Sequence, residues 1–158
     1  MANERYIDAA ITHLRDFINT NLPAQLRAVE TEQGLTASSL TDPEDVLKHR
    51  APFDNRSPLV EIFEESWAFI DIRNKLISTD CTVALHHMGD ADLEAGEIFG
   101  RRYMTAIIQC VLSDTTLGGK VVTIIPTDGA SVVGRGDNAT TRRVYTQGFD
   151  IHTHEGAG

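Results

Sequence analysis

The order of structural patterns along the chain is the feature that most constrains its fold. An amphipathic helical pattern opens the sequence, strand-like segments follow, and a second amphipathic helical pattern runs from about Asp92 to Asp114. A Gly118-Gly119 break then leads into β-rich sequence that continues to the end. This succession predicts an α+β fold, with two main helices packed on a mostly antiparallel β-sheet and with long projecting loops.

The opening pattern predicts a helix over residues 3–20. Its apolar residues recur at three- and four-residue spacing, and polar residues fill the other face. A further helical stretch, Leu22–Gln33, has Pro23 in its first turn, where proline is tolerated, and Gly34 fits a left-handed cap. The two stretches form either separate helices or one bent helix.

The segment Leu35–Ser57 is poor in apolar residues and is predicted to be mainly loop. Within it, Asp42-Pro43-Glu44-Asp45 combines a helix N-cap residue, a proline suited to the first turn and acidic side chains, which predicts a short helical turn through His49. A loop of this length is either functional or partner-bound, or it is a mobile flap.

Three runs rich in β-branched and aromatic residues predict two or three antiparallel strands in the middle of the chain. They span residues 59–63, 67–72 and 82–85, and Asn74-Lys75 is the expected turn between the second and third. Gly89-Asp90 ends the strand region, and Asp90 or Asp92 offers an N-cap for the second helix.

Several predictions for the second half of the chain depend on its glycines. Gly96 and Gly100 lie four residues apart, which indicates either a weak helix start or a close approach to a neighbouring backbone. After the glycine pair, residues 120–125 predict a strand that Pro126 must end or place at a sheet edge. The last predicted strand runs from about residue 142 to 154, and Gly148 allows a bulge.

Between these last two strands, Thr127–Thr141 is rich in Gly, Asp, Ser and Asn. It is predicted to be a long projecting hairpin or a partly disordered arm. Its Arg135-Gly136-Asp137 tripeptide is known from cell-adhesion ligands, but three residues recur by chance easily.

The amino-acid composition narrows the class of protein to which the chain can belong. The 158 residues, 41% of them hydrophobic and 23% charged, predict one globular domain over residues 1–158. A net charge of −9 argues against binding nucleic acid or anionic membranes through phosphate neutralisation. Charges interrupt the opening segment every few residues, so we expect neither a signal peptide nor a membrane span. Cys81 and Cys110 are expected to be buried free thiols.

No catalytic motif is present, and we predict no enzymatic activity, no cofactor and no metal. His152 and His154 face the same side of a predicted strand beside Glu155, a spacing that metals can use, but a solvated tail is the simpler interpretation. A small metal-dependent enzyme is therefore retained only as a rival hypothesis. His86 and His87 should point to opposite faces of a strand and so cannot chelate together.

Charged residues in the loops and on outward-facing positions are the candidates for contacts between subunits. These candidate interface residues are Asp42, Glu44, Asp45, Arg101, Arg102, Arg135, Asp137, Arg142 and Arg143. Exposed ion pairs of this kind contribute about 0–1 kcal/mol each.

Four segments, spread over most of the chain, resemble the tail terminator (tail completion) proteins of long-tailed bacteriophages and gene-transfer particles. They are Asn21-Leu22-Pro23-Ala24-Gln25-Leu26, Ser57-Pro58-Leu59-Val60-Glu61-Ile62, Arg102-Tyr103-Met104-Thr105-Ala106-Ile107 and Leu117-Gly118-Gly119. The polar loop before Pro58 is longer than the family pattern.

The resemblance implies a structural virion protein that is assembled in the host cytoplasm and located at the head-proximal end of the tail. It implies a homo-hexameric ring that ends tail-tube growth and contacts the tail tube protein and the head-completion (stopper) protein. DNA would pass through the ring without specific binding, no membrane is involved, and an acidic lumen would suit this passage. Another head-tail connector component, such as an adaptor or stopper, is the alternative.

Overall fold

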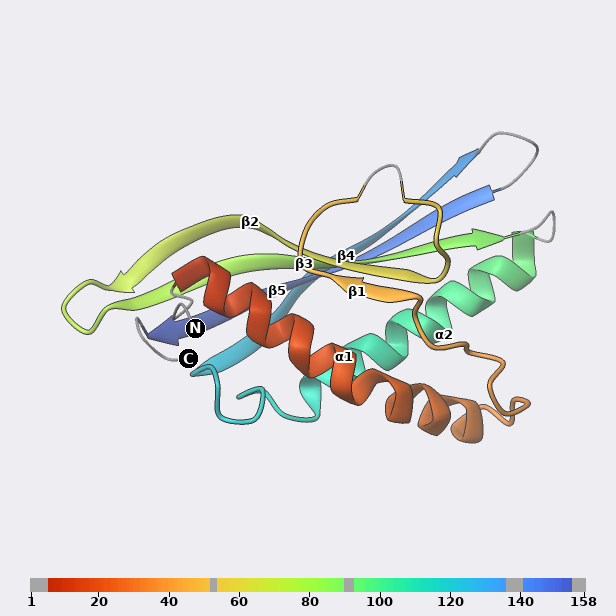
Figure 1. Cartoon of the computed structure of the whole chain (residues 1–158), viewed down its shortest axis with the longest axis horizontal. Coiled ribbons are helices and arrows are strands. Elements are labelled where there is room, and N and C mark those ends of the chain that lie inside the picture. Colours follow the sequence, from red (N-terminus) through yellow and green to blue (C-terminus); the bar gives the residue numbers. More distant parts are fainter. Residues whose placement is uncertain (1–5, 52–53, 90–92, 136–140, 155–158) are drawn as a thin grey trace.

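The computed structural model describes residues 6–51, 54–89, 93–135 and 141–154. In chain order, the elements are α1 (Tyr6–Glu32), β1 (Asp45–Leu47), β2 (Leu59–Asp71), β3 (Leu76–Gly89), α2 (Leu93–Leu112), β4 (Thr123–Arg135) and β5 (Thr141–His154). The strands form one sheet in the order β1-β2-β3-β5-β4. Only β1 and β2 pair in parallel, so the prediction of two helices on a mostly antiparallel sheet is confirmed (Figure 1).

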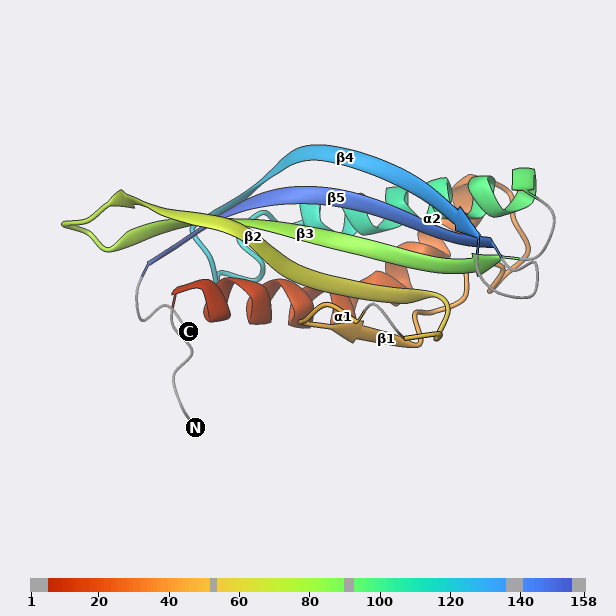
Figure 2. The same ribbon diagram turned by 90° about the horizontal axis from the view of Figure 1, so that it is seen from above.

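Both helices pack on one face of the sheet, and the hydrophobic core lies between the two layers (Figure 2). The pattern along β5 shows this division clearly, because odd-numbered residues from Thr141 to Thr153 are buried and even-numbered ones are partly exposed. Since successive side chains of a strand point to opposite faces, the even-numbered residues define a face that the helices leave open. We call it the open face.

The first helix is one continuous element, which resolves the two alternatives for the start of the chain. Leu14, Ile18, Leu22 and Leu26 are fully buried, so a single apolar stripe continues on both sides of Pro23. Packing of this stripe holds the helix together despite the backbone hydrogen bond that proline removes. Gly34 has φ +66°, which confirms the predicted left-handed cap.

The region between α1 and β2 differs from the prediction. The expected helical turn through His49 is wrong, because residues 45–47 form strand β1, with Val46 paired to Val60 and buried. Leu40 is also buried in the core. This loop is therefore anchored to its own chain rather than projecting as an arm, because its few apolar residues complete the core.

The middle strands are longer than their apolar runs suggest. The first two predicted runs belong to one strand, β2, which continues through an irregularity between Glu64 and Ser66. The turn at Asn74-Lys75 is confirmed, with Lys75 at φ +54°. In Figure 1 the end of the β2–β3 hairpin extends beyond the first turn of α1. Residues 64–70 of β2 are exposed, and we call Glu64–Asp71 the β2 arm.

The hairpin alternative is confirmed for residues 127–135, which belong to β4, a strand paired with β5. β4 and β5 remain paired out to Arg135 and Thr141, and residues 136–140, including Asp137, lie outside the described part of the chain. Pro126 lies within β4, which is an edge strand. Of the two predicted alternatives, a strand end or a sheet edge, the second is confirmed. A bulge was predicted at Gly148. The irregularity lies at this position, but the additional residues are those of β4 between Pro126 and Gly129.

The second helix packs tightly on β5 through its two glycines. A Cβ atom at Gly96 would lie 2.3 Å from Nη1 of Arg143, and one at Gly100 would lie 2.1 Å from Cε2 of Tyr145. The glycines are thus a packing feature, but they admit side chains from β5 rather than a neighbouring backbone. Asp90 and Asp92, the proposed cap residues, lie outside the described residues.

The two cysteines confirm the expectation of buried free thiols. Burial raises the pKa of Cys110 to about 11 and raises the pKa of Cys81 further above its ordinary value. Both thiols should therefore react slowly. In the described part of the chain, neither helix has the length and apolar character needed to cross a membrane.

Candidate functional site

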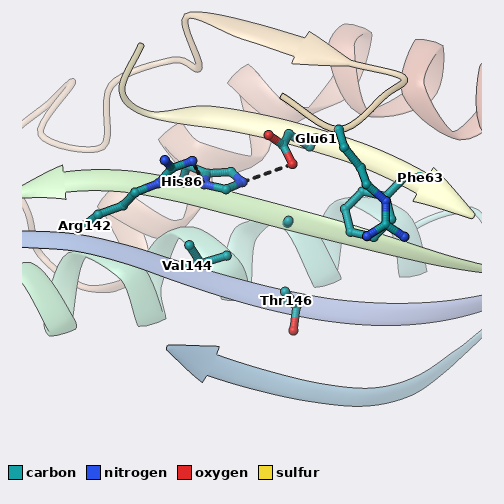
Figure 3. Close-up of a pocket in the computed structure, with 8 residues that line it drawn as sticks. Glu61, Phe63, His86, Arg142, Val144 and Thr146 are labelled. Atoms are coloured by element: carbon teal, nitrogen blue, oxygen red, sulfur yellow. Dashed lines mark hydrogen bonds and ion pairs between the residues drawn. The ribbon is translucent and has the colours of Figure 1, made fainter. Parts of the chain in front are cut away.

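A polar cluster lines a cavity on the open face of the sheet. Glu61, His86 and Arg142 come from β2, β3 and β5, and the pairing of these strands brings them to the same face. Figure 3 shows the three side chains above the sheet, with Phe63, Val144 and Thr146 along the same cavity. The cavity has a volume of about 340 Å³.

The centre of this cluster is buried. Glu61 and His86 are 4% and 8% exposed, and Nε2 of His86 lies 3.1 Å from Oε2 of Glu61. This contact lacks the geometry of a directed hydrogen bond. Nη2 of Arg142 lies 2.7 Å from Nδ1 of His86. A guanidinium can only donate, so Nδ1 must accept, which assigns the proton of a neutral imidazole to Nε2.

The loop before β2 closes one side of the cavity. The backbone N–H of Ala51 donates to Oε1 of Glu61 at 3.0 Å, and the guanidinium of Arg50 lies 4.0 Å from the ring centroid of Phe63. Glu61 therefore holds the loop as well as facing His86. Because both ring nitrogens of His86 already face protein groups, the arrangement suits binding better than proton transfer to a substrate.

An ion-pair cluster ties the same loop to β1. Arg56 donates from Nη2 to Oδ2 of Asp54 at 2.7 Å and from Nη1 to Oδ2 of Asp45 at 2.9 Å. The side-chain hydrogen bonds from Arg56, together with its backbone N–H, lower the pKa of Asp54 to about 2. The same pairing raises the pKa of Arg56.

This lowered pKa predicts acid sensitivity. The ordinary pKa of an aspartate in an unfolded chain is 3.8, so the stabilising contribution of Asp54 is complete above that value and is lost as the pH falls towards about 2. We expect the melting temperature of Asp54→Asn to lie below that of the wild type at pH 6, and the difference to shrink between pH 4 and pH 2. Thermal melts followed by circular dichroism would measure this, and a difference independent of pH would contradict the assignment.

The candidate interface residues are divided between surface and interior. Arg101 is exposed on α2 and lies 3.2 Å from Glu97, while Arg102 lines a cavity with Leu35 and Phe99. Arg142 belongs to the open-face cluster. Arg143, in contrast, is fully buried and donates to the backbone oxygen of Leu93 at 3.1 Å, so it is enclosed by its own chain.

Two of the three acidic candidates in the long loop have side-chain partners within the chain. Asp42 accepts from Arg27 at 3.2 Å, and Asp45 accepts from Arg56. The backbone N–H of Glu44 donates to Pro58. Arg135 ends β4, and nothing is described of its side chain or of Asp137. Of the candidates whose side chains the structure describes, Arg142 alone belongs to the open-face cluster.

The histidines lie as their strand positions predict. His86 faces the open side, whereas His87 stacks on Phe99 with ring centroids 4.2 Å apart, so the two point to opposite faces. His152 lies 3.0 Å from Asp150, and Nδ1 of His154 lies 3.1 Å from the backbone oxygen of Asn74. In the ranges that the structure describes, no group of three or more His, Cys, Asp or Glu side chains is arranged to hold a metal ion.

Sequence reasoning missed Glu61 and Arg50 as parts of a site, and it treated Trp67 only as a strand residue. Glu61 lies in an otherwise apolar run, Leu59–Ile62, and an isolated acid between buried residues was the available signal. The partners of Glu61 depend on strand register, which the local pattern does not fix.

Comparisons with known proteins give little further information on identity. No family model matches the chain, and no curated protein matches it. Among solved structures, a chain from the virion of a native gene transfer agent (GTA) particle is similar, with 17% sequence identity and a TM-score of 0.49. The match covers 87% of this chain and 94% of that chain. At this level of similarity, function has to be argued from the surfaces of the chain itself.

Proposed function

We propose that this chain is a tail terminator, a structural virion protein that assembles into a hexameric ring at the head-proximal end of a phage-like tail tube. The ring ends tube polymerisation and provides the surface to which the head-completion protein joins. The protein acts by assembly and has no catalytic role.

The observation that carries the proposal is the uncovered apolar surface on two separate strands. The β2 arm exposes Trp67, Phe69 and Ile70, and the edge strand β4 exposes Val132 and Val133. The short strand β1 pairs with residues 59–61, so within the described ranges no strand pairs with the outer backbone edge of the arm. Long apolar edge strands promote pairing with other chains, and such patches mark association surfaces.

The arrangement of these surfaces favours a ring. In the strand order, β4 lies at one edge of the sheet, and the β2 arm lies on the opposite side. A contact between two different patches is heterologous, and it generates a closed ring when the rotation between copies closes. The four segments that resemble tail terminators support the position at the end of a tube. The net charge of −9 is compatible with DNA passing through without binding.

Native mass spectrometry over a concentration series tests the assembly. We expect a discrete hexamer for the wild-type chain, and we expect Val132→Lys to lower the hexamer population at least tenfold because it places a charge on the exposed edge strand. Leu112→Lys is the matched control, because it charges an exposed apolar residue at the end of α2 and should leave the hexamer intact. A monomer at every concentration would contradict a ring that forms before docking.

Tube polymerisation tests the role. Added to the growing tail tube protein of the same particle, the ring should stop elongation and be seen at one tube end by electron microscopy. A ring that leaves tube length unchanged and binds the portal side instead would identify a head-tail adaptor.

A further inference from the structure

The open-face cavity has the chemistry of a site for an aromatic side chain. Its floor is apolar, formed by Phe63, Ala84 and Val144, and its rim carries the guanidinium groups of Arg50 and Arg142. Arg50 already lies over the ring of Phe63 at 4.0 Å. Guanidinium groups stack on aromatic faces, and tryptophan is the most favourable aromatic partner.

The chain contains a single tryptophan, and it is exposed. Trp67 lies on the β2 arm with 56% of its surface accessible. Tryptophan left on a surface is characteristic of binding hot spots, because its large apolar face gains from burial in a partner. Glu64 precedes it on the arm and is exposed, so the segment presents an acidic side chain to a basic rim, whereas Glu65 lies 3.6 Å from Arg50 of its own chain.

Trp67 cannot fill the cavity of its own chain. Trp67 pairs with Thr79, whose side chain is buried on the helix-covered face, whereas the cavity lies on the open face. The two groups therefore project from opposite sides of the same sheet. Only a second copy can bring an indole to the cavity.

We propose that Trp67 of one subunit inserts into the open-face cavity of the next, between the guanidinium groups of Arg50 and Arg142. This inference rests on the proposed ring assembly and names the contact that joins neighbouring subunits. Because donor and acceptor surfaces differ, the contact is heterologous and continues from subunit to subunit until the ring closes.

Fluorescence provides a direct test, because Trp67 is the only tryptophan. At concentrations where native mass spectrometry detects only monomer, the emission maximum should be that of exposed indole. It should shift to shorter wavelength as the hexamer forms, and iodide should then quench it several-fold less. If the emission maximum stays at the long wavelength of exposed indole and iodide still quenches the emission in a confirmed hexamer, the Trp67 contact is overturned but the ring is not. Absence of a hexamer would instead contradict the proposed function itself.

Cysteine cross-linking locates the partner site. Ala68→Cys, an exposed position next to Trp67 on the β2 arm that leaves the indole in place, and Thr146→Cys, which lines the cavity, are prepared as separate proteins. The native cysteines are buried, so a short bismaleimide should react mainly at the introduced thiols. We expect a covalent dimer containing one copy of each variant when the two are mixed.

The controls for this experiment use the same chemistry. Each variant alone should give no covalent dimer, and neither should Ala68→Cys mixed with Leu112→Cys, an exposed position at the end of α2. Cross-linking of Ala68→Cys to position 112 but not to position 146 would overturn the assignment. Trp67→Phe should keep most of the hexamer and Trp67→Ala should lose it, which separates aromatic insertion from a general effect on folding.

Discussion

Tyr103→Ala is expected to lower the free energy of unfolding by about 3–5 kcal/mol, the range typical of a large aromatic side chain lost from a core. Tyr103 is fully buried on α2, and its ring lies 5.5 Å from that of Phe99. Urea denaturation followed by circular dichroism, at a concentration where native mass spectrometry detects only monomer, would measure the loss.

Tyr103→Phe should behave quite differently. The hydroxyl of Tyr103 makes no hydrogen bond to any residue that the structure describes, and burial raises its pKa. Removing an unsatisfied buried hydroxyl while keeping the ring should leave stability unchanged or raise it by up to about 1 kcal/mol. A loss greater than about 1 kcal/mol in Tyr103→Phe would show that the hydroxyl has a partner.

The second large effect is expected at Gly100. Gly100→Ala should lower the free energy of unfolding by about 1–3 kcal/mol, because the new methyl group would overlap the ring of Tyr145. This loss occurs although alanine is intrinsically favoured over glycine in a helix by about 1 kcal/mol. Denaturant unfolding measures the change.

A double-mutant cycle isolates the cause at Gly100. In a Tyr145→Ala background the overlap is absent, so Gly100→Ala should become neutral or stabilising. Gly134→Ala is the control, since a Cβ atom there would meet only the backbone oxygen of Arg142 at 3.9 Å. An equal loss from Gly100→Ala in both backgrounds would place the cause in the helix itself rather than in its contact with β5.

Local patterns predicted the elements that have one clear period. The apolar stripe of α1, the alternation of β5 and the glycine cap at Gly34 can be read directly from residue spacing. Strand β1 could not be predicted in this way, because three residues are too few to show a period. The residues Asp42-Pro43 just before it also indicated the start of a helix. Tertiary pairing of Val46 with Val60 decided the outcome.

The candidate site was harder to foresee because it depends on register. Glu61 and His86 are far apart in sequence and meet only because β2 pairs with β3. A shift of one residue would turn one of them towards the helices. Arg143 illustrates the same point, since it reads as a surface charge in the sequence but points inward on β5.

The outer edge of the β2 arm has a consequence for the unassembled protein. Its apolar run, residues 67–70, has high β-propensity and carries no charge, which is the composition of segments that nucleate aggregates. Charged residues stand on both sides of the run, with Glu64 and Glu65 before it and Asp71 and Arg73 after it. Such flanking charges disfavour indiscriminate stacking of identical strands. The arm can thus stay exposed without driving the protein into aggregates during synthesis.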